Sequence, residues 1–364
     1  MKKIMILHPE GNINFNPNLT GIVEILCEQQ YVVHYYCPRK SGFSQIPPCS
    51  GATIVYLENN QVRLADSYDL IIGVDYGGII LASMVARQLR IPYGFISYEL
   101  FFSDETGMKF KTPEIESCQG IAFAVCQGGE RSRQLAIENR FPPEKVINIP
   151  VAGRSPQRGL KTRWLHESLG LPANRKVALY IGSLVSAWAM LDELIENTHY
   201  WGDEWVLVLH TRYDEPRLVQ DVHKKHPEAR NVFFSPECGI SFEKLQNLIY
   251  AADMGLAFYK PTFTDFYDGK NLQYIGLSSG KIATYLQHGL PVVTNASGEI
   301  SDYVEQYKLG FAVRDIRQLH LELRKVNSTD LAESRESCFR FFHEKLDLNT
   351  QAGPLLEVIK QAVS

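Results

Sequence analysis

Residues 274–294 read YIGLSSGKIATYLQHGLPVVT, and this stretch decides the fold. It predicts a small, hydroxyl-rich turn, a helix of about two turns from near Ser279 to a stop at Gly289, and a short Val-rich strand. The N–H groups at such a helix start lie beside serine hydroxyls and the ammonium of Lys281, so they attract an anion such as a phosphate. A plain helix cap with a solvated lysine is the alternative.

Two common nucleotide-binding motifs do not fit the chain. Gly276 and Gly280 stand one residue too close for a Walker A loop, and Ile282 replaces the Ser or Thr that would bind magnesium. The first predicted strand is followed by PEGNINFNPN at residues 9–18, which contains no G-x-G-x-x-G. The sequence therefore argues against an ATPase and against an NAD dehydrogenase.

The composition is that of a globular protein with two domains. The 364 residues include 45% hydrophobic and 21% charged residues, and the formal net charge is −4. A chain of this length is long for one core, and its charge gives no bulk attraction to nucleic acid. Seven scattered cysteines without a C-x-x-C pair argue against a disulfide framework or a zinc site. We expect no nucleic-acid partner, no metal and no cofactor.

The apolar runs are too short to cross a bilayer, so no transmembrane segment is predicted. Residues 1–8 have a charged start but reach polar residues at once, which favours a first strand over a signal peptide. Together with the cysteine usage, this predicts a cytoplasmic protein. A homo-oligomer is compatible with the sequence.

Strand-like and helix-like runs alternate along both halves of the chain, as a parallel sheet flanked by helices requires. The expected strands are 3–8, 31–36, 70–74, 93–97, 120–124, 146–149, 177–181, 205–209, 232–234, 254–258 and 291–294. The expected helices are 19–29, 79–89, 130–139, 189–198, 242–251, 279–287 and 353–363.

The alternation breaks at the Pro- and Gly-containing residues 150–159, which read as a linker. We therefore predict an α/β protein with two Rossmann-like parallel-sheet domains, residues 1–155 and 156–345, and a C-terminal helix, residues 346–364, that returns to the first domain. Open parallel sheets bind ligands at the carboxyl ends of their strands, so the two domains are expected to face a cleft.

Residues 271–294, with Gly289-Leu290-Pro291-Val292 after the helix, resemble the donor-binding segment of GT-B glycosyltransferases, especially the retaining, family-four-like group. In that group a turn, a helix and a G-x-P-V strand enclose the diphosphate and ribose of a nucleotide-sugar. The resemblance implies that the second domain binds the donor and the first binds the acceptor. It also implies a hexosyltransferase that moves a sugar from a nucleotide-diphosphate sugar, with a UDP-sugar favoured, to a hydroxyl acceptor with retention.

The resemblance implies the donor site residue by residue. The diphosphate would lie against Gly182 and Ser183, in the turn after residues 179–181, and against Ser278, Ser279, Gly280 and Lys281. The family usually has a basic residue after the first turn, where this chain reads SAWA at 186–189, so Lys281, Lys270 or Arg212 would supply the charge. Ile240 would contact the nucleobase through its backbone, and Thr284 the ribose.

The chain departs from the family at two carboxylates. Members commonly have two glutamates around the donor turn, and the matching positions here are Gly276 and Thr284. The usual carboxylate contacts to the donor sugar and ribose are therefore absent, which is the pattern of a divergent branch. This departure keeps open a non-catalytic nucleotide-sugar-binding partner as an alternative to an enzyme.

In the first domain, residues 91–102 resemble a family strand that commonly ends in His-Glu-Leu at the cleft. Tyr98 stands at the histidine position and Glu99 is kept. A carboxylate at the end of a buried strand suggests that Glu99 binds or activates a hydroxyl acceptor, with a structural ion pair to Arg131 or Lys109 as the alternative. Gly11 and Asn12, in the loop after the first strand, are expected in the same region.

The predicted function is thus sugar transfer in glycan, glycoconjugate or polysaccharide synthesis. In a retaining enzyme the leaving diphosphate can take the acceptor proton, so the main catalytic demand is to stabilise charge on that diphosphate. We assign this role to the helix start with Lys281, and an acceptor role to Glu99. A nucleotide-sugar epimerase of the same fold is a second alternative, and it would need paired acid/base groups.

Overall fold

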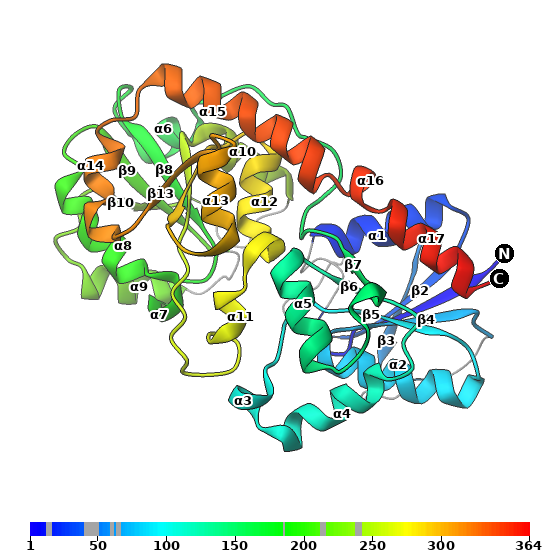
Figure 1. Cartoon of the computed structure of the whole chain (residues 1–364). Coiled ribbons are helices and arrows are strands. Elements are labelled where there is room, and N and C mark those ends of the chain that lie inside the picture. Colours follow the sequence, from blue (N-terminus) through cyan, green and yellow to red (C-terminus); the bar gives the residue numbers. More distant parts are fainter. Residues whose placement is uncertain are drawn as a thin grey trace. The chain divides into compact units, whose positions relative to one another are not determined.

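The computed structural model describes residues 1–11, 17–39, 51–58, 62, 67–184, 186–211, 216–236 and 242–364. These residues form two compact units (Figure 1). Unit 1 contains residues 1–154, 263–280 and 345–364, and unit 2 contains residues 155–262 and 281–344. The segment 263–280 thus belongs to unit 1 although it lies between parts of unit 2 in the sequence. The predicted domain limits remain a prediction.

In the described part of unit 1, seven parallel strands form one sheet in the order β3-β2-β1-β4-β5-β6-β7. They are β1 (Lys3–Leu7), β2 (Val32–Pro38), β3 (Thr53–Leu57), β4 (Leu70–Val74), β5 (Tyr93–Ile96), β6 (Ala124–Cys126) and β7 (Val146–Asn148). The sequence LIIGV of β4 is buried throughout, as expected for a central strand covered on both faces.

Helices cover both faces of this sheet (Figure 1). One face packs against α1 (Pro17–Glu28), α16 (Leu348–Gln351) and α17 (Gly353–Ala362). The other packs against α2 (Asp75–Leu89), α4 (Met108–Cys118) and α5 (Gly129–Glu138). Leu355 and Ile359 of α17 are buried in the same core as β1, so the predicted return of the C-terminal helix to the first sheet is confirmed. Shorter helices are α3 (Ser103–Thr106), η2 (Pro143–Lys145), α11 (Lys270–Gln273) and η4 (Gly276–Ser278).

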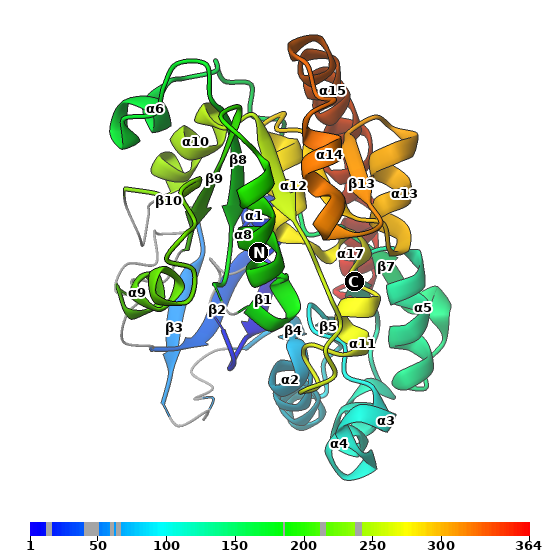
Figure 2. The ribbon, with the colours of Figure 1, turned by 90° about the vertical axis from the view of Figure 1, so that its left-hand side faces the viewer.

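In the described part of unit 2, six parallel strands form a sheet in the order β10-β9-β8-β11-β12-β13. They are β8 (Lys176–Ile181), β9 (Trp205–His210), β10 (Val232–Phe234), β11 (Met254–Ala257), β12 (Val292–Asn295) and β13 (Gly310–Val313). Side chains of α8 (Leu191–Asn197) and α14 (Leu319–Leu323) share a core with one face of β8 and β9, and α8 lies over these strands in Figure 2.

The remaining helices of unit 2 complete the layers of an α/β domain. They are α6 (Trp164–Leu169), α7 (Ser186–Ala189), η3 (Thr198–Tyr200), α9 (Pro216–Lys225), α10 (Phe242–Ala251), α12 (Gly280–Gln287), α13 (Gly298–Gln306), η5 (Ile316–Gln318) and α15 (Ser328–Phe341). The π-helix η6 (Phe342–Leu346) begins in unit 2 and ends in unit 1. A capping box of Asn327 and Asp330 begins α15. The first residue of α12, Gly280, belongs to unit 1, and the rest of the helix to unit 2.

The predicted α/β class with two parallel Rossmann-like sheets is confirmed, and most predicted elements agree with the structure to within a few residues. The predicted strand 120–124 is wrong in its position, because β6 occupies Ala124–Cys126. Gly120 is instead packed against Tyr93, whose hydroxyl would lie 2.7 Å from a Cβ at residue 120. None of the helices in the described part of the chain is long and apolar enough to span a bilayer.

Candidate functional site

The predicted diphosphate turn follows β8 in unit 2. Gly182 has a φ of +148°, and its N–H donates to the His210 carbonyl at 2.9 Å, which extends the pairing with β9 by one residue. A Cβ at this position would lie 3.2 Å from Cε and 3.3 Å from Nζ of Lys281. Glycine therefore serves both the backbone conformation and the close approach of the lysine.

Lys281, at the start of α12, places its ammonium in an aromatic environment. Nζ lies 4.0 Å from the ring centroid of Tyr180 and 5.5 Å from that of Tyr259. Nζ is buried and makes no hydrogen bond to any residue that the structure describes. Burial lowers the pKa of Lys281 to about 7. Ring faces offset only part of the lost hydration, so an anion next to Nζ would restore a partner that the charged form lacks.

Tyr259 is held through both its backbone and its ring. Its backbone N–H donates to Oδ1 of Asn295 at 3.0 Å, and its carbonyl accepts from Nδ2 of Asn295 at 2.8 Å. Asn295 is the last residue of β12. Its ring stacks on Trp188 with the planes 6° apart and the centroids 6.3 Å apart. Tyr259 is therefore a fixed wall of the lysine site.

Tyr285, one turn after Lys281, connects α12 to the strands. Its buried hydroxyl accepts a hydrogen bond from the Ile181 N–H at 2.9 Å and donates to the Leu179 carbonyl at 3.1 Å. Its ring fits over Gly255, where a Cβ would lie 2.5 Å from the ring. Tyr285 thus fixes the lysine-bearing helix against the end of β8.

The structure brings Gly182 and Lys281 together and places the other predicted donor residues as follows. The Ser183 carbonyl accepts from the Tyr180 hydroxyl at 2.9 Å, and Thr284 is half-buried on the next turn of α12. The Ser278 hydroxyl donates to the Ile275 carbonyl, and Ser279 is buried. Ser278, Ser279 and Gly280 belong to unit 1, whereas Gly182 and Lys281 belong to unit 2. The predicted residues Arg212 and Ile240 lie outside the described residues, as does Asn12.

A second group of polar side chains lies in unit 1, after β4 and β5. Asp75 begins α2 with a φ of +55°, and its Oδ1 accepts from the N–H groups of Tyr98 at 2.6 Å and Glu99 at 3.0 Å. Burial, followed by the neighbouring Glu99 carboxylate, raises the pKa of Asp75 well above its ordinary value. Sequence reasoning missed this aspartate, although its place directly after an all-buried strand was a usable signal.

Glu99 is coupled to the segment 263–280. Its Oε2 accepts from Nδ2 of Asn271 at 2.5 Å, and Oδ1 of Asn271 accepts from Nη2 of Arg131 at 2.6 Å. Burial raises the pKa of Glu99, and the charge of Arg131 and the amide of Asn271 oppose that shift. The expected partner Arg131 thus reaches Glu99 through Asn271, which sequence reasoning had not selected.

The two other predicted residues of unit 1 lie in the same region. The Tyr98 hydroxyl donates to Oδ1 of Asn18 at 2.7 Å, and Asn18 donates to the Pro150 carbonyl at 3.2 Å. Gly11 is buried after the end of β1. In the described residues, no group of three or more His, Cys, Asp or Glu side chains is arranged to hold a metal ion.

The fold matches that of GT-B glycosyltransferases of known structure. HepE of Anabaena, solved in complex with UDP-glucose, superposes with a TM-score of 0.78 over 99% of this chain and 100% of its own, at 14% identity. Sucrose-phosphate synthase from Thermosynechococcus elongatus gives 0.68 at 13% identity, with 99% of both chains covered. An α,α-trehalose-phosphate synthase (UDP-forming) from Burkholderia vietnamiensis gives 0.66 at 13%, with 100% of this chain and 98% of that chain covered. The chain therefore has the GT-B fold.

A protein-family model matches part of the second half of the chain. Residues 210–346 match the family model described as glucosyltransferase 3-like, C-terminal domain, and this range includes Lys281 and Tyr285. No curated protein sequence matches the chain significantly.

Proposed function

We propose that the protein is a glycosyltransferase that moves a sugar from a nucleotide-diphosphate sugar, with a UDP-sugar favoured, to a hydroxyl acceptor with retention. The observation that carries this proposal is the buried ammonium of Lys281, which has no hydrogen-bond partner in the described chain and lies beside Gly182 at the start of α12. A cation so placed is suited to the negative charge that develops on a departing diphosphate. HepE, of the same fold, was solved with UDP-glucose.

Donor binding is assigned to unit 2, with Gly182, Ser183, Lys281 and Arg212 at the diphosphate, Thr284 at the ribose and Ile240 at the base. Ser278, Ser279 and Gly280 are proposed to complete the diphosphate site. Glu99 in unit 1 is proposed to orient the acceptor hydroxyl, and Tyr98, Gly11 and Asn12 are proposed acceptor-binding residues. The diphosphate takes the acceptor proton, so no cofactor or metal is required. Glycan or glycoconjugate synthesis in the cytoplasm would be the setting.

One observation favours a second candidate, a nucleotide-sugar epimerase of the same fold. Asp75 and Glu99 are neighbouring buried carboxyls, and burial raises the pKa of each. Such a pair can hold one proton between two acids, which acid/base chemistry on a sugar needs. The two candidates differ in whether a second sugar-containing product is formed.

The test is incubation of the whole protein with UDP-glucose, UDP-galactose, UDP-N-acetylglucosamine or GDP-mannose, with and without a mixture of methyl glycosides. Free nucleoside diphosphate and the remaining donor are measured by chromatography. Release of UDP from a UDP-sugar, accelerated by a glycoside, is the expected result. Conversion of one UDP-sugar into another without net UDP release would establish the epimerase, and binding without any turnover would overturn both enzymes.

A further inference from the structure

Five aromatic side chains of unit 1 pack into one cluster, here called the aromatic shelf: Tyr76, Phe101, Phe110, Phe266 and Tyr267. Phe101 is buried at its centre and contacts the other four rings. Tyr76 stacks on Phe110 with centroids 4.4 Å apart, and Phe101 lies 5.3 Å from Phe266 and 5.4 Å from Tyr267. Tyr267 is 49% exposed and Phe266 is partly exposed. Large aromatic rings left in solvent on a well-packed domain indicate a surface that binds something.

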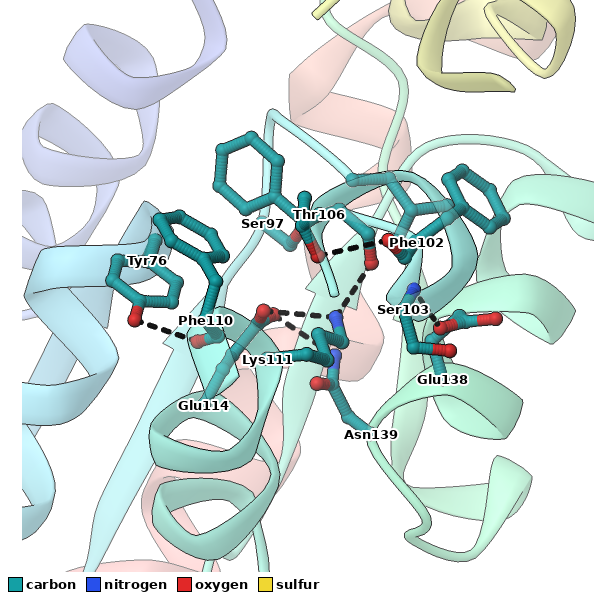
Figure 3. A network of polar contacts seen from close by, with 12 residues as sticks. Tyr76, Ser97, Phe102, Ser103, Thr106, Phe110, Lys111, Glu114, Glu138 and Asn139 are labelled. Carbon is teal, nitrogen blue, oxygen red and sulfur yellow. Dashed lines mark hydrogen bonds and ion pairs between the residues drawn. The ribbon is translucent and has the colours of Figure 1, made fainter. Parts of the chain in front are cut away.

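The shelf has a rigid support (Figure 3). Lys111 is fully buried; it pairs with Glu114 at 2.8 Å and donates to the Phe101 carbonyl at 2.7 Å. The Tyr76 hydroxyl donates to the Phe110 carbonyl at 2.8 Å. These bonds fix the backbone that carries Phe101 and Phe110, so the rings above are held in place before any ligand arrives.

The exposed part of the shelf is anchored in the same way. The Asp268 carboxylate accepts from the N–H groups of Thr264 and Asp265, both at 2.9 Å, which closes the loop around Phe266 and Tyr267. The Lys270 N–H donates to Glu105 of α3 at 2.8 Å. Both rings are therefore presented by a fixed loop.

Carboxylates adjoin the aromatic shelf. Nδ2 of Asn271 donates both to Glu99, at 2.5 Å, and to the carbonyl of Tyr267, at 3.2 Å. Glu10 accepts from the N–H of Gly77, the residue after Tyr76, at 2.8 Å. Burial, followed by the charges of Glu10 and Glu99, raises the pKa of Tyr267.

We propose that the aromatic shelf and its carboxylates bind the acceptor, and that this acceptor is an uncharged sugar ring. The inference rests on the proposed function and names its acceptor class. A pyranose has an apolar C–H face that packs on an aromatic ring and hydroxyls at its edge that donate to carboxylates. Exposed Glu10 contributes negative charge to this group, which disfavours an acidic sugar or a phosphate. Tyr267 is the central contact, because it is the most exposed ring of the shelf and adjoins Glu99.

The experiment uses simple glycosides as probes and needs no turnover. Saturation-transfer NMR and titration measure binding of methyl β-glucoside, methyl β-galactoside, methyl N-acetyl-β-glucosaminide and methyl β-glucuronide to the whole protein. The glucuronide has the ring of the glucoside with a carboxylate at C6, so this pair isolates charge. We expect at least one neutral glycoside to bind with a Kd of about 10 mM or tighter, and the glucuronide about tenfold more weakly than the glucoside.

Substitutions of Tyr267 locate the site. Tyr267→Ala should weaken neutral glycoside binding by about tenfold or more, whereas Tyr267→Phe, which keeps the ring, should stay within about threefold of the parent. Tyr200→Ala is the matched control, because Tyr200 is a 60% exposed tyrosine of unit 2, and it should change nothing. UDP binding, measured separately by calorimetry, should be the same in all of these proteins.

Three results would overturn the inference: no neutral glycoside binding, equal binding of the glucuronide and the glucoside, or unchanged binding in Tyr267→Ala. Any of these with normal UDP binding removes the acceptor proposal and leaves the proposed donor site intact. Loss of UDP binding in the parent protein would instead contradict the proposed function.

Discussion

At the scale of single residues, Lys281 has the chemistry that depends most on pH. Its native pKa of about 7 lies below the value of about 10.4 for a lysine in an unfolded chain. Below about pH 7 the lysine is charged in both the folded and the unfolded state, so the cost of burying its charge lowers the free energy of unfolding in full. As pH rises from about 7 to 10, Lys281 is neutral in the folded state but still charged in the unfolded state, so this cost decreases steadily and disappears near pH 10.

We therefore predict that Lys281→Met stabilises the ligand-free protein most at low pH. The free energy of unfolding should exceed that of the parent by several kcal/mol, as an order of magnitude, near pH 6, and the difference should shrink toward zero near pH 10. Urea unfolding of both proteins across this range measures it. A difference that does not vary with pH would mean that Lys281 keeps an ordinary pKa.

Glu99 supports a second prediction at this scale. If its carboxylate orients or partly deprotonates the acceptor hydroxyl, Glu99→Gln should slow transfer on the order of a hundredfold, as expected for a positioned acid or base. Glutamine keeps the shape and can still bond Asn271. Donor affinity, measured by calorimetry, should stay nearly unchanged because Glu99 belongs to unit 1.

The outcomes for Glu99→Gln separate three roles. Slower transfer with unchanged donor affinity supports the acceptor role. A matching loss of donor affinity would move Glu99 to the donor site. An unaltered rate with a lower melting temperature would make Glu99 a structural partner of the Asn271 and Arg131 network.

At the scale of elements, the position of α12 against β8 depends on Tyr285. Tyr285→Phe leaves the Ile181 N–H and the Leu179 carbonyl without the hydroxyl that bonds both. Removing a partner from a buried polar group costs about 1–3 kcal/mol, so the free energy of unfolding should fall by that amount. Urea unfolding measures the change.

Tyr303→Phe is the control. The Tyr303 hydroxyl donates to Glu299 at a half-buried position, so its removal should lower the free energy of unfolding by less than about 0.5 kcal/mol. Equal effects of the two substitutions would contradict the connecting role of Tyr285.

Elements with a strong apolar pattern could be predicted from the sequence, and weakly patterned ones could not. The all-buried β4 (Leu70–Val74) agrees with its predicted bounds. β3 (Thr53–Leu57) and β13 (Gly310–Val313) lie at the edges of their sheets, mix exposed or half-buried residues with buried ones, and were missed. α4 (Met108–Cys118) was also missed, because it contains Pro113 and many polar residues.

The same limit applies to the candidate site. The approach of Lys281 to Gly182 follows from two motifs that a known family pairs, so it could be anticipated. The contact of Asn271 with Glu99 joins residues that are 172 positions apart in the chain, and no local pattern encodes it. Asp75 adopts a positive φ that its residue type favours only modestly. Such features follow from tertiary packing and not from periodicity.

At the scale of the whole molecule, the two parallel sheets establish the GT-B fold, and the fold by itself does not assign a reaction. The fold is shared by proteins at 13–14% identity, which include HepE, a sucrose-phosphate synthase and a trehalose-phosphate synthase. Function must therefore be argued from the sites. The central claim is that Lys281 stabilises the diphosphate of a nucleotide-sugar during transfer.

The most direct test of this claim is the turnover of the accepted nucleotide-sugar under saturating donor by the parent, Lys281→Ala and Lys224→Ala. Lys224 is an exposed lysine of α9 in the same unit and serves as the matched control. We predict that Lys281→Ala remains folded and loses about 2–4 kcal/mol of transition-state stabilisation, a fall of roughly thirty- to a thousandfold in rate, while Lys224→Ala keeps the parent rate. A rate for Lys281→Ala within about twofold of the parent would contradict the account.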